Sequence, residues 1–203
     1  MPAPGAGMRE LRTVTGRAAV LDRPDVDTDQ IIPKQFLKRI ERSGYGEFLF
    51  YDWMKEPGFE LRRPEYEGAQ ILVAGRNFGC GSSREHAAWA LEDYGFRVVL
   101  APSYSDIFRT NAVKTGLAPI ELPEDELARV RAAVGERNEL TVNLETLEIT
   151  HPDGLKVAFV LDPYARETLL HGLDDVARTM KRETAIAAYE ATTAARFDTR
   201  AVA

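Results

Sequence analysis

Residues 70–122 alternate short apolar runs with segments of helical composition, and this alternation constrains the fold more than any other feature. The predicted order is strand 70–74, helix 83–94, strand 97–101, helix 105–115 and strand 117–122. Each apolar run has the length of a buried strand and is bounded by glycine, proline or serine. Strands that alternate with helices pair in parallel, because a parallel connection has to cross over the sheet. The sequence therefore predicts an α/β fold with a parallel sheet at its core.

The sequence on either side of this region predicts further elements. We expect a strand at 11–21, a short helix from Pro33 to about Glu41, a helix at 123–135, strands at 140–144, 147–150 and 157–161, and helices at 162–172 and 174–194. Short turns separate the three later strands, which predicts an antiparallel meander. The stretch 44–63 is rich in aromatic residues, glycine and proline. It predicts a loop with short helical turns that covers an edge of the core or meets a partner.

The length of the chain sets its domain organisation. A chain of 203 residues can bury one good core, so we predict a single domain spanning residues 1–203, with a mixed sheet, flanking helices and a C-terminal helical extension. No repeat or low-complexity linker divides it. Residues 1–8 are expected to form a loose N-terminal tail, and residues 195–203 a frayed C-terminus.

Charge and hydropathy exclude several classes of function. The net charge is −6 and there is no block of basic residues, which argues against nucleic-acid binding. No apolar run is long enough to span a bilayer, so we expect no membrane contact. The first seven residues lack the charged start and apolar centre of a signal peptide, and a cytoplasmic location is expected.

Cysteine and histidine usage limits the metal chemistry. Cys80 is the only cysteine, so neither a disulfide within the chain nor a cluster held by three or four of its own cysteines can form. The three histidines fall in different predicted elements, with no pair at the spacing of helical metal ligands. We predict that this chain binds no metal by itself.

The connection between strand 70–74 and its helix carries the strongest functional signal. Residues 75–84, the glycine loop, read GRNFGCGSSR. Gly75, Gly79 and Gly81 permit positive φ angles and let a ligand approach the backbone closely. The first turn of the following helix offers unpaired amides to a negative group. These features predict an anion-binding loop.

Two interpretations of the end of this loop compete. Ser82 and Glu85 match a capping box, which needs no ligand. Arg84 argues against capping alone, because a positive charge in the first turn of a helix is unfavourable unless an anion lies nearby. The planar guanidinium of Arg84, with the hydroxyls of Ser82 and Ser83, suits a carboxylate. We favour a carboxylate site.

Three stretches in order resemble the small-subunit family of 3-isopropylmalate dehydratases, which is similar to the swivel domain of the aconitase superfamily. They are DTDQIIPKQFL at 27–37, GRNFGCGSSREHAAWAL at 75–91 and APSYSDIFRTN at 101–111. The resemblance covers most of the chain and implies a swivelling β/β/α domain of the aconitase type. It also implies a hydro-lyase that interconverts 2-isopropylmalate and 3-isopropylmalate by dehydration and rehydration in leucine biosynthesis. In that family, a large-subunit partner carries a [4Fe–4S] cluster, which suits a chain that has one cysteine.

The same resemblance implies the catalytic and carboxylate-binding residues. Ser82 would be the catalytic base, moving a proton between two neighbouring carbons of a small hydroxy di-acid. A serine hydroxyl is too weak a base in water, so helix amides and positive charge would have to stabilise its alkoxide. Arg84 and Ser83 would bind a substrate carboxylate. Thr28 and Asp29 would lie beside the site and are predicted among the substrate-binding residues, with Asp29 orienting Arg84 or Ser82.

The stretch that follows would contain the residues that choose the substrate. The apolar pair Phe36 and Leu37 would suit an isopropyl group. Lys34 is either a second carboxylate contact or a solvated side chain, and Asp27 is interpreted as part of a turn. Arg39 lies close to the position where relatives that take a second carboxylate carry an arginine. Homoaconitase-like and methylmalate- or citraconate-type hydro-lyases therefore remain alternative substrate classes.

Two other functional classes fit the loop less well. A non-catalytic anion-binding module lacks support because the Gly-Lys-Ser/Thr of a phosphate-binding loop is missing. A serine hydrolase would need Gly-x-Ser-x-Gly, which residues 81–85 do not match. Cys80 could pair with His86 as a nucleophile, but a small buried residue is the simpler interpretation.

Overall fold

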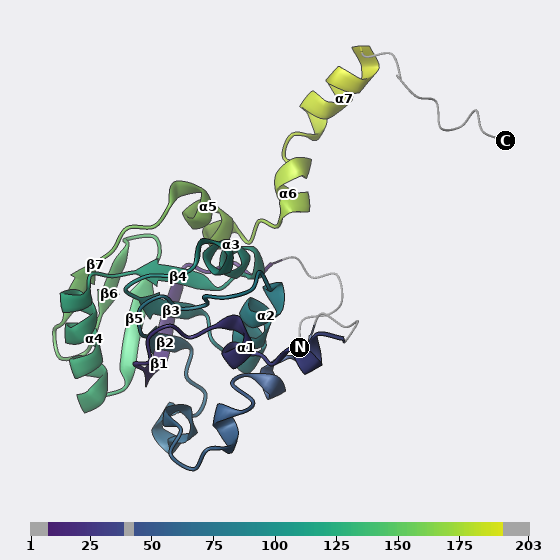
Figure 1. Cartoon of the computed structure of the whole chain (residues 1–203). Coiled ribbons are helices and arrows are strands. Elements are labelled where there is room, and N and C mark those ends of the chain that lie inside the picture. The colour runs from purple at the N-terminus through teal and green to yellow at the C-terminus, as the bar shows by residue number, and fades with distance from the viewer. Residues whose placement is uncertain (1–7, 39–42, 193–203) are drawn as a thin grey trace.

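The computed structural model describes residues 8–38 and 43–192 (Figure 1). Within these ranges the strands form one seven-stranded sheet in the order β4-β3-β2-β1-β5-β6-β7. The strands are β1 (Thr13–Leu21), β2 (Ile71–Ala74), β3 (Val98–Ala101), β4 (Ala118–Glu121), β5 (Glu139–Asn143), β6 (Glu148–Thr150) and β7 (Lys156–Ala158). Strands β1 to β4 pair in parallel, whereas β1 with β5, β5 with β6 and β6 with β7 pair antiparallel. Both the parallel core and the antiparallel meander are confirmed, and together they form a mixed sheet.

The helices lie where the sequence pattern placed most of them. They are α1 (Thr28–Ile31), α2 (Glu85–Tyr94), α3 (Asp106–Thr115), α4 (Glu124–Glu136), α5 (Pro163–His171), α6 (Asp175–Met180) and α7 (Glu183–Thr192). The aromatic stretch contains the short 3-10 helices η2 (Gly46–Phe48), η3 (Trp53–Lys55), η4 (Glu60–Arg62) and η5 (Pro64–Tyr66). The predicted helix from Pro33 is wrong in type, since residues Lys34–Lys38 form the 3-10 helix η1. Residues 39–42, including Arg39, lie outside the described residues.

Successive residues of each central strand face opposite sides of the sheet and supply two cores. The first core takes Leu21, Leu72 and Val99 from the sheet and packs against α2 and the aromatic stretch, seen as the blue turns beneath the sheet in Figure 1. The second core takes Ile71 and Val98 and packs against α4, α5 and the meander. The aromatic stretch therefore covers an edge of the core, as one of its two interpretations predicted.

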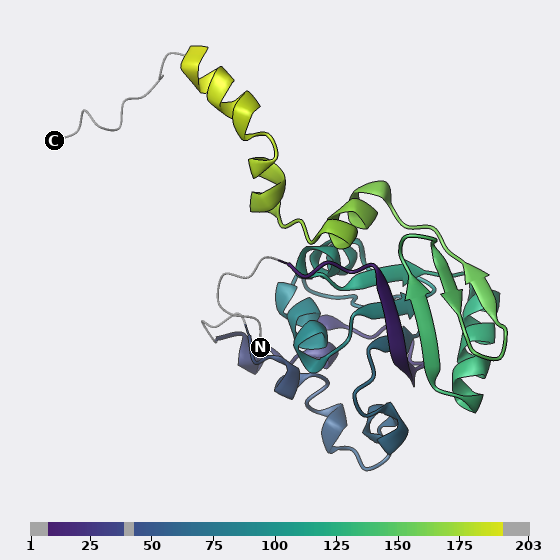
Figure 2. The same ribbon diagram turned by 180° about the vertical axis from the view of Figure 1, so that it is seen from behind.

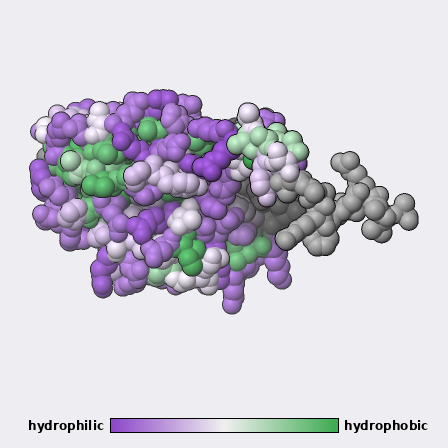
Figure 3. Space-filling view, turned by 90° about the horizontal axis from the view of Figure 1, so that it is seen from above, coloured by the Kyte–Doolittle hydropathy of each residue, from purple (hydrophilic) through white to green (hydrophobic). Residues whose placement is uncertain are grey.

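The C-terminal extension departs from the single helix predicted at 174–194. The amide of Arg182 donates to the carbonyl of Thr179 at 2.9 Å, a tightened turn that separates α6 from α7. Helix α6 is fastened to the body by the Lys114–Asp175 and Arg178–Glu167 ion pairs, both at 3.0 Å. Every residue of α7 is exposed, and Figures 1 and 2 show it projecting from the body. Figure 3 shows its pale green apolar side chains beside the grey atoms of the C-terminus.

The ends of the chain are only partly described. Residues 1–7 and 193–203 lie outside the described residues, and so do most of the predicted N-terminal tail and the predicted frayed C-terminus. Met8, which we had assigned to the tail, lies against the body, because a Cβ atom added to Gly172 would meet the Met8 carbonyl oxygen at 2.2 Å. Glycine at position 172 permits that close approach.

Candidate active site

The predicted site lies where the carboxyl ends of β1, β2 and β3 meet. Parallel strands bring these ends to one edge of a sheet, and the loops that leave them bind one another. The amide of Phe78 donates to the carbonyl of Ser103 at 3.0 Å. The amides of Gly79 and Cys80 both donate to the carbonyl of Val26, at 2.8 and 3.2 Å. The glycine loop is thus held between the loops that follow β1 and β3.

The glycines of this loop serve packing more than ligand approach. Gly79 has φ +73°, and a Cβ atom there would lie 2.2 Å from Cγ of Phe108. A Cβ on Gly75 would lie 2.3 Å from the carbonyl oxygen of Arg23. Because the amides of Gly79 and Cys80 already bind Val26, the middle of the loop is not available to an anion. Any anion site lies at the end of the loop, from residue 81 onward.

Helix α2 begins two residues later than predicted. Its N-cap is Arg84, which makes no side-chain capping bond, and its first helical residue is Glu85. The capping-box interpretation of Ser82 and Glu85 is therefore wrong, and Arg84 precedes the helix instead of lying within its first turn. The later start of α2 is explained by a hydrogen bond from the hydroxyl of Thr28 to the carbonyl of Ser82 at 3.1 Å. That bond holds Ser82 against α1, and the helical conformation begins only at Glu85.

Ser82 and Ser83 are exposed and directly precede Arg84, the N-cap of α2. Their position just before a helix N-terminus places them near amides that have no partner within the helix. Arg84 beside them is mostly buried, with 17% of its side chain exposed. This edge therefore combines a helix start, one guanidinium and two hydroxyls that have no hydrogen-bond partner among the described residues, which suits a negatively charged group.

Asp29 forms an ion pair with Arg84. Nη1 of Arg84 donates to Oδ1 of Asp29, so the bond links the end of the glycine loop to α1. The Arg84 hydrogen bond holds the pKa of Asp29 below its ordinary value, with a smaller contribution from the charge of Lys34. Asp29 is 51% exposed, so solvent screens the pair and its value lies in orientation more than in stability. The carboxylate fixes one side of the guanidinium fork.

Thr28 and Asp27 are structural neighbours of this pair. Thr28 is 2% exposed, and its amide donates to the carbonyl of Cys80 at 2.9 Å. Asp27 caps α1 in a capping box, in which its carboxylate accepts from the Gln30 amide at 2.7 Å and its own amide donates to Oε1 of Gln30 at 2.8 Å. Asp27 thus has a structural role, as the cap of a helix instead of part of the predicted turn. Burial keeps the Thr28 hydroxyl on the backbone of the glycine loop.

The predicted specificity residues contact the aromatic stretch. The ring of Phe36 stacks on Phe48 with centroids 4.1 Å apart and meets Tyr51 edge-on at 4.8 Å. Leu37 is partly buried against the first core. Lys34 is exposed, and its charge contributes to the lowered pKa of Asp29. Phe48 and Tyr51 were missed as neighbours of Phe36, although the aromatic richness of 44–63 was the available signal.

Cys80 has its own hydrogen bond and does not depend on His86. Its Sγ donates to the carbonyl of Asp25 at 3.4 Å, and burial raises the pKa of the thiol, aided by the charges of Asp27 and Asp25. The ring of His86 instead packs against Tyr45 and Trp89, at 5.2 and 4.6 Å between centroids. A protonated thiol is a poor nucleophile, which argues against a Cys80–His86 pair, although Cys80 is only partly buried and not the fully buried residue expected.

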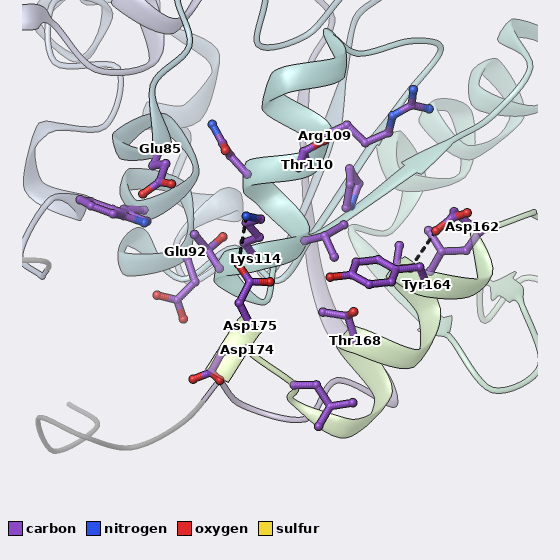
Figure 4. Close-up of a pocket in the computed structure, with 18 of the residues that line it drawn as sticks. Glu85, Glu92, Arg109, Thr110, Lys114, Asp162, Tyr164, Thr168, Asp174 and Asp175 are labelled. Atoms are coloured by element: carbon purple, nitrogen blue, oxygen red, sulfur yellow. Dashed lines mark hydrogen bonds and ion pairs between the residues drawn. The ribbon is translucent and has the colours of Figure 1, made fainter. Parts of the chain in front are cut away.

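A cavity in the described part of the molecule lies away from these residues. A cavity of about 840 Å³ opens between α2, α3, α5 and α6, and Figure 4 shows Glu92, Lys114, Tyr164 and Asp175 around it. Of the site residues predicted from the sequence, none lines this cavity. A site that a second chain completes need not form a pocket in one chain, so the position of this cavity does not argue against a site at Ser82.

Neither a cluster of metal ligands nor a membrane-spanning helix is found in the described residues. Within residues 8–38 and 43–192 no group of three or more histidine, cysteine, aspartate or glutamate side chains could hold a metal ion. None of the helices in the described ranges is long and apolar enough to cross a membrane.

Comparison with known proteins decides the family. The aconitase C-terminal domain matches residues 8–125. The 3-isopropylmalate dehydratase small subunit of Geobacillus kaustophilus is 54% identical over 190 residues, covering 90% of this chain and 96% of that protein. The chain belongs to the 3-isopropylmalate dehydratase small-subunit family. The resemblance seen in the sequence is confirmed, and membership makes this chain a subunit of a hydro-lyase of the aconitase superfamily.

Other relatives agree with this assignment. The small subunit of the Bacillus subtilis enzyme is 49% identical over 190 residues, covering 90% of this chain and 96% of that protein. The crystal structure of a 3-isopropylmalate dehydratase from Methanocaldococcus jannaschii matches with a TM-score of 0.66 and 28% identity, covering 87% of this chain and 99% of that one. The aconitase-type α/β fold predicted from the resemblance is confirmed.

Proposed function

We propose that this chain is the small subunit of a 3-isopropylmalate dehydratase and supplies half of a shared active site. The observation that carries the proposal is the convergence of Asp29 and Thr28 on Arg84 and Ser82, across 55 and 54 residues of sequence. These four residues belong to two of the three stretches that resemble the family. The names of relatives near 50% identity over nine-tenths of the chain support the substrate.

In this proposal Ser82 is the catalytic base. Its alkoxide takes a proton from the carbon next to a substrate carboxylate while the substrate hydroxyl leaves the neighbouring carbon. The protonated Ser82 then returns a proton to that neighbouring carbon, and the hydroxyl is added back at the carbon that lost its proton. The unpaired amides at the start of α2 and the charge of Arg84 stabilise the alkoxide in a site from which the partner excludes water. Exposure of Ser82 in the separate chain is what a base facing a second subunit requires.

Arg84 and Ser83 bind the substrate carboxylate. Asp29 holds one side of the guanidinium, which leaves the remaining N–H groups to point at the ligand as a planar fork. A carboxylate held by that fork places its neighbouring carbon close to Ser82, and such positioning lowers the barrier by restricting motion before reaction. Lys34 adds positive charge near Asp29.

The [4Fe–4S] cluster of this enzyme class is assigned to the large subunit. The residues of this chain do not fit a cluster, because Cys80 is its only cysteine and already donates to the carbonyl of Asp25. The partner is therefore an iron–sulfur large subunit that covers the face carrying Ser82. This chain contributes proton transfer and carboxylate binding.

Phe36 and Leu37 would provide the apolar subsite for the isopropyl group. Phe48 and Tyr51 hold the ring of Phe36, so the subsite has a rigid aromatic wall. The alternative substrates are the homoaconitase-like and methylmalate- or citraconate-type acids. Their side chains differ from isopropyl by carboxylate or methyl groups, and a hydrophobic pocket discriminates a methylene by about 1–3 kcal/mol, roughly 10–200-fold.

Anaerobic reconstitution tests the proposal. The purified chain is assayed alone and with its cluster-bearing large subunit, against 2-isopropylmalate, homocitrate-type and methylmalate-type acids. We expect no turnover by the chain alone and the highest kcat/KM for 2-isopropylmalate in the pair. Turnover by the isolated chain would overturn the shared site, and preference for another acid would overturn the substrate.

A further inference from the structure

The catalytic serine of the proposed site has no side-chain support of its own. Ser82 is exposed and lies before the first residue of α2, so helix geometry does not set its orientation. Within the described residues its side-chain oxygen makes no hydrogen bond, and the bond recorded for it is at its carbonyl oxygen. A base has to be held close to its reacting geometry, since a misplacement of about 1 Å can cost roughly 100-fold in rate. The backbone must therefore position Ser82.

The bond at that carbonyl comes from Thr28. Its Oγ1 donates to the Ser82 carbonyl at 3.1 Å, and its amide donates to the Cys80 carbonyl at 2.9 Å. Thr28 thus holds two carbonyls on either side of Gly81. Gly81 has φ +89°, and a Cβ atom there would lie 3.6 Å from Thr28 Oγ1, so the turn passes directly over this hydroxyl.

The donor is itself fixed. Thr28 is 2% exposed, which leaves its hydroxyl no contact with bulk water, and it is the first residue of α1, whose start the Asp27 capping box closes. The next residue, Asp29, holds Arg84. Neighbouring residues of one short helix therefore hold both the base and the carboxylate-binding arginine, and they set the spacing between them.

We infer that Thr28 is a positioning residue for Ser82 and does not touch the substrate. Its hydroxyl orients the Ser82 peptide so that Oγ faces the carbon from which the proton is removed. The inference rests on the proposed function and revises the direct substrate-binding role expected of Thr28 from the sequence. Valine has nearly the shape of threonine without the hydroxyl, and serine keeps the hydroxyl without the methyl group.

The test compares Thr28→Val with Thr28→Ser in the reconstituted pair. We expect Thr28→Val to lower kcat by roughly 10–100-fold while KM changes less than about threefold, because carboxylate binding by Arg84 is intact. Thr28→Ser should restore kcat to within about threefold of wild type. Thermal unfolding and gel filtration of the pair establish that each variant folds and assembles. Equal kcat values for valine and wild type, or equal losses in valine and serine, would overturn the inference.

A second comparison covers the case in which the valine variant does not fold. Thr28→Ala and Thr28→Ser both lack the methyl group and differ only in the hydroxyl, so a lower kcat for alanine isolates the hydrogen bond. Equal kcat values for these two variants would overturn the inference in the same way.

A double variant separates this inference from the function on which it rests. In a Ser82→Ala background, Thr28→Val should lower the residual rate no further, because the group that it positions is gone. A further loss of the same size would show that Thr28 acts on something else and would overturn the inference. If Ser82→Ala alone retains full turnover, the base assignment fails instead, whatever Thr28→Val does.

Discussion

The parallel and antiparallel halves of the sheet differ in what their connections do. In the parallel half, β1, β2 and β3 release their loops at one edge, where the loops bind one another and carry Thr28, Asp29, Ser82 and Arg84. In the antiparallel half, β5 and β6 are joined by a tight turn. Asn143 accepts there from the amides of Glu145 and Thr146 at 2.8 and 3.0 Å. The connections of the parallel half bring the proposed site residues together, whereas the β5–β6 turn of the antiparallel half is closed by hydrogen bonds between its own residues.

Strand direction explains the difference. Parallel strands send every carboxyl end to the same edge, so loops distant in sequence meet there. Antiparallel neighbours alternate direction, and short turns satisfy their own backbone groups. We therefore expect the parallel half to control activity and the antiparallel half to control stability, and four variants test that division from the largest expected effect to the smallest.

Ser82→Ala should have the largest effect. Loss of the base should reduce turnover of the reconstituted pair by about 10²–10⁴-fold, the usual contribution of general acid–base catalysis. Complex formation and unfolding temperature should remain those of wild type, because Ser82 is exposed. The matched control is Thr146→Ala at the exposed β5–β6 turn, which should leave turnover unchanged. Similar turnover for Ser82→Ala and Thr146→Ala would contradict the idea that the parallel half controls activity.

Leu140→Ala tests the other half. Leu140 on β5 is fully buried in the second core, so truncation should lower the free energy of unfolding by about 2–5 kcal/mol. Urea unfolding measures this loss. The kcat of the assembled, folded pair should match wild type, and a fall in kcat comparable with that of Ser82→Ala would contradict the division.

Arg84→Lys should raise KM in the parallel half. Lysine keeps the charge but loses the planar fork, and a lost hydrogen bond to a charged group costs about 1.5–3 kcal/mol, roughly 10–100-fold in KM. Steady-state kinetics with 2-isopropylmalate measures the change. Arg12→Lys is the control, since Arg12 pairs with Glu10 and Glu145 at the exposed antiparallel side. An unchanged KM in Arg84→Lys would exclude guanidinium recognition of the carboxylate.

Asp29→Asn should give the smallest effect, on the dependence of stability on pH. The Arg84 hydrogen bond lowers the pKa of Asp29 below 3.8 in the folded chain, so its contribution is present above that pH and is lost as the pH falls through the lowered value. Wild type should therefore have a slightly higher free energy of unfolding than the variant at pH 6, and this gap should narrow as the pH falls below 3.8. Urea midpoints measure it, and a gap that widens in acid would contradict the pairing.

The sequence alone determined the order of strands and helices, because apolar periodicity and turn residues act between near neighbours. It did not predict α1 or its cap at Asp27, although the capping partners are only three residues apart. The single cysteine excluded a cluster held by this chain before any fold was known. The ordered motifs also pointed correctly to the family.

Tertiary structure decided the starting residue of α2, the burial of Thr28 and the stacking of Phe36 on Phe48. Ser82 and Glu85 have the pattern of a capping box, yet a bond from Thr28, 54 residues earlier, holds Ser82 outside the helix. That partner becomes a neighbour only because β1 and β2 pair in parallel and bring their following loops together. Local propensity sets which conformations a segment favours, whereas the contacts that choose among them come from strand pairing across the sheet.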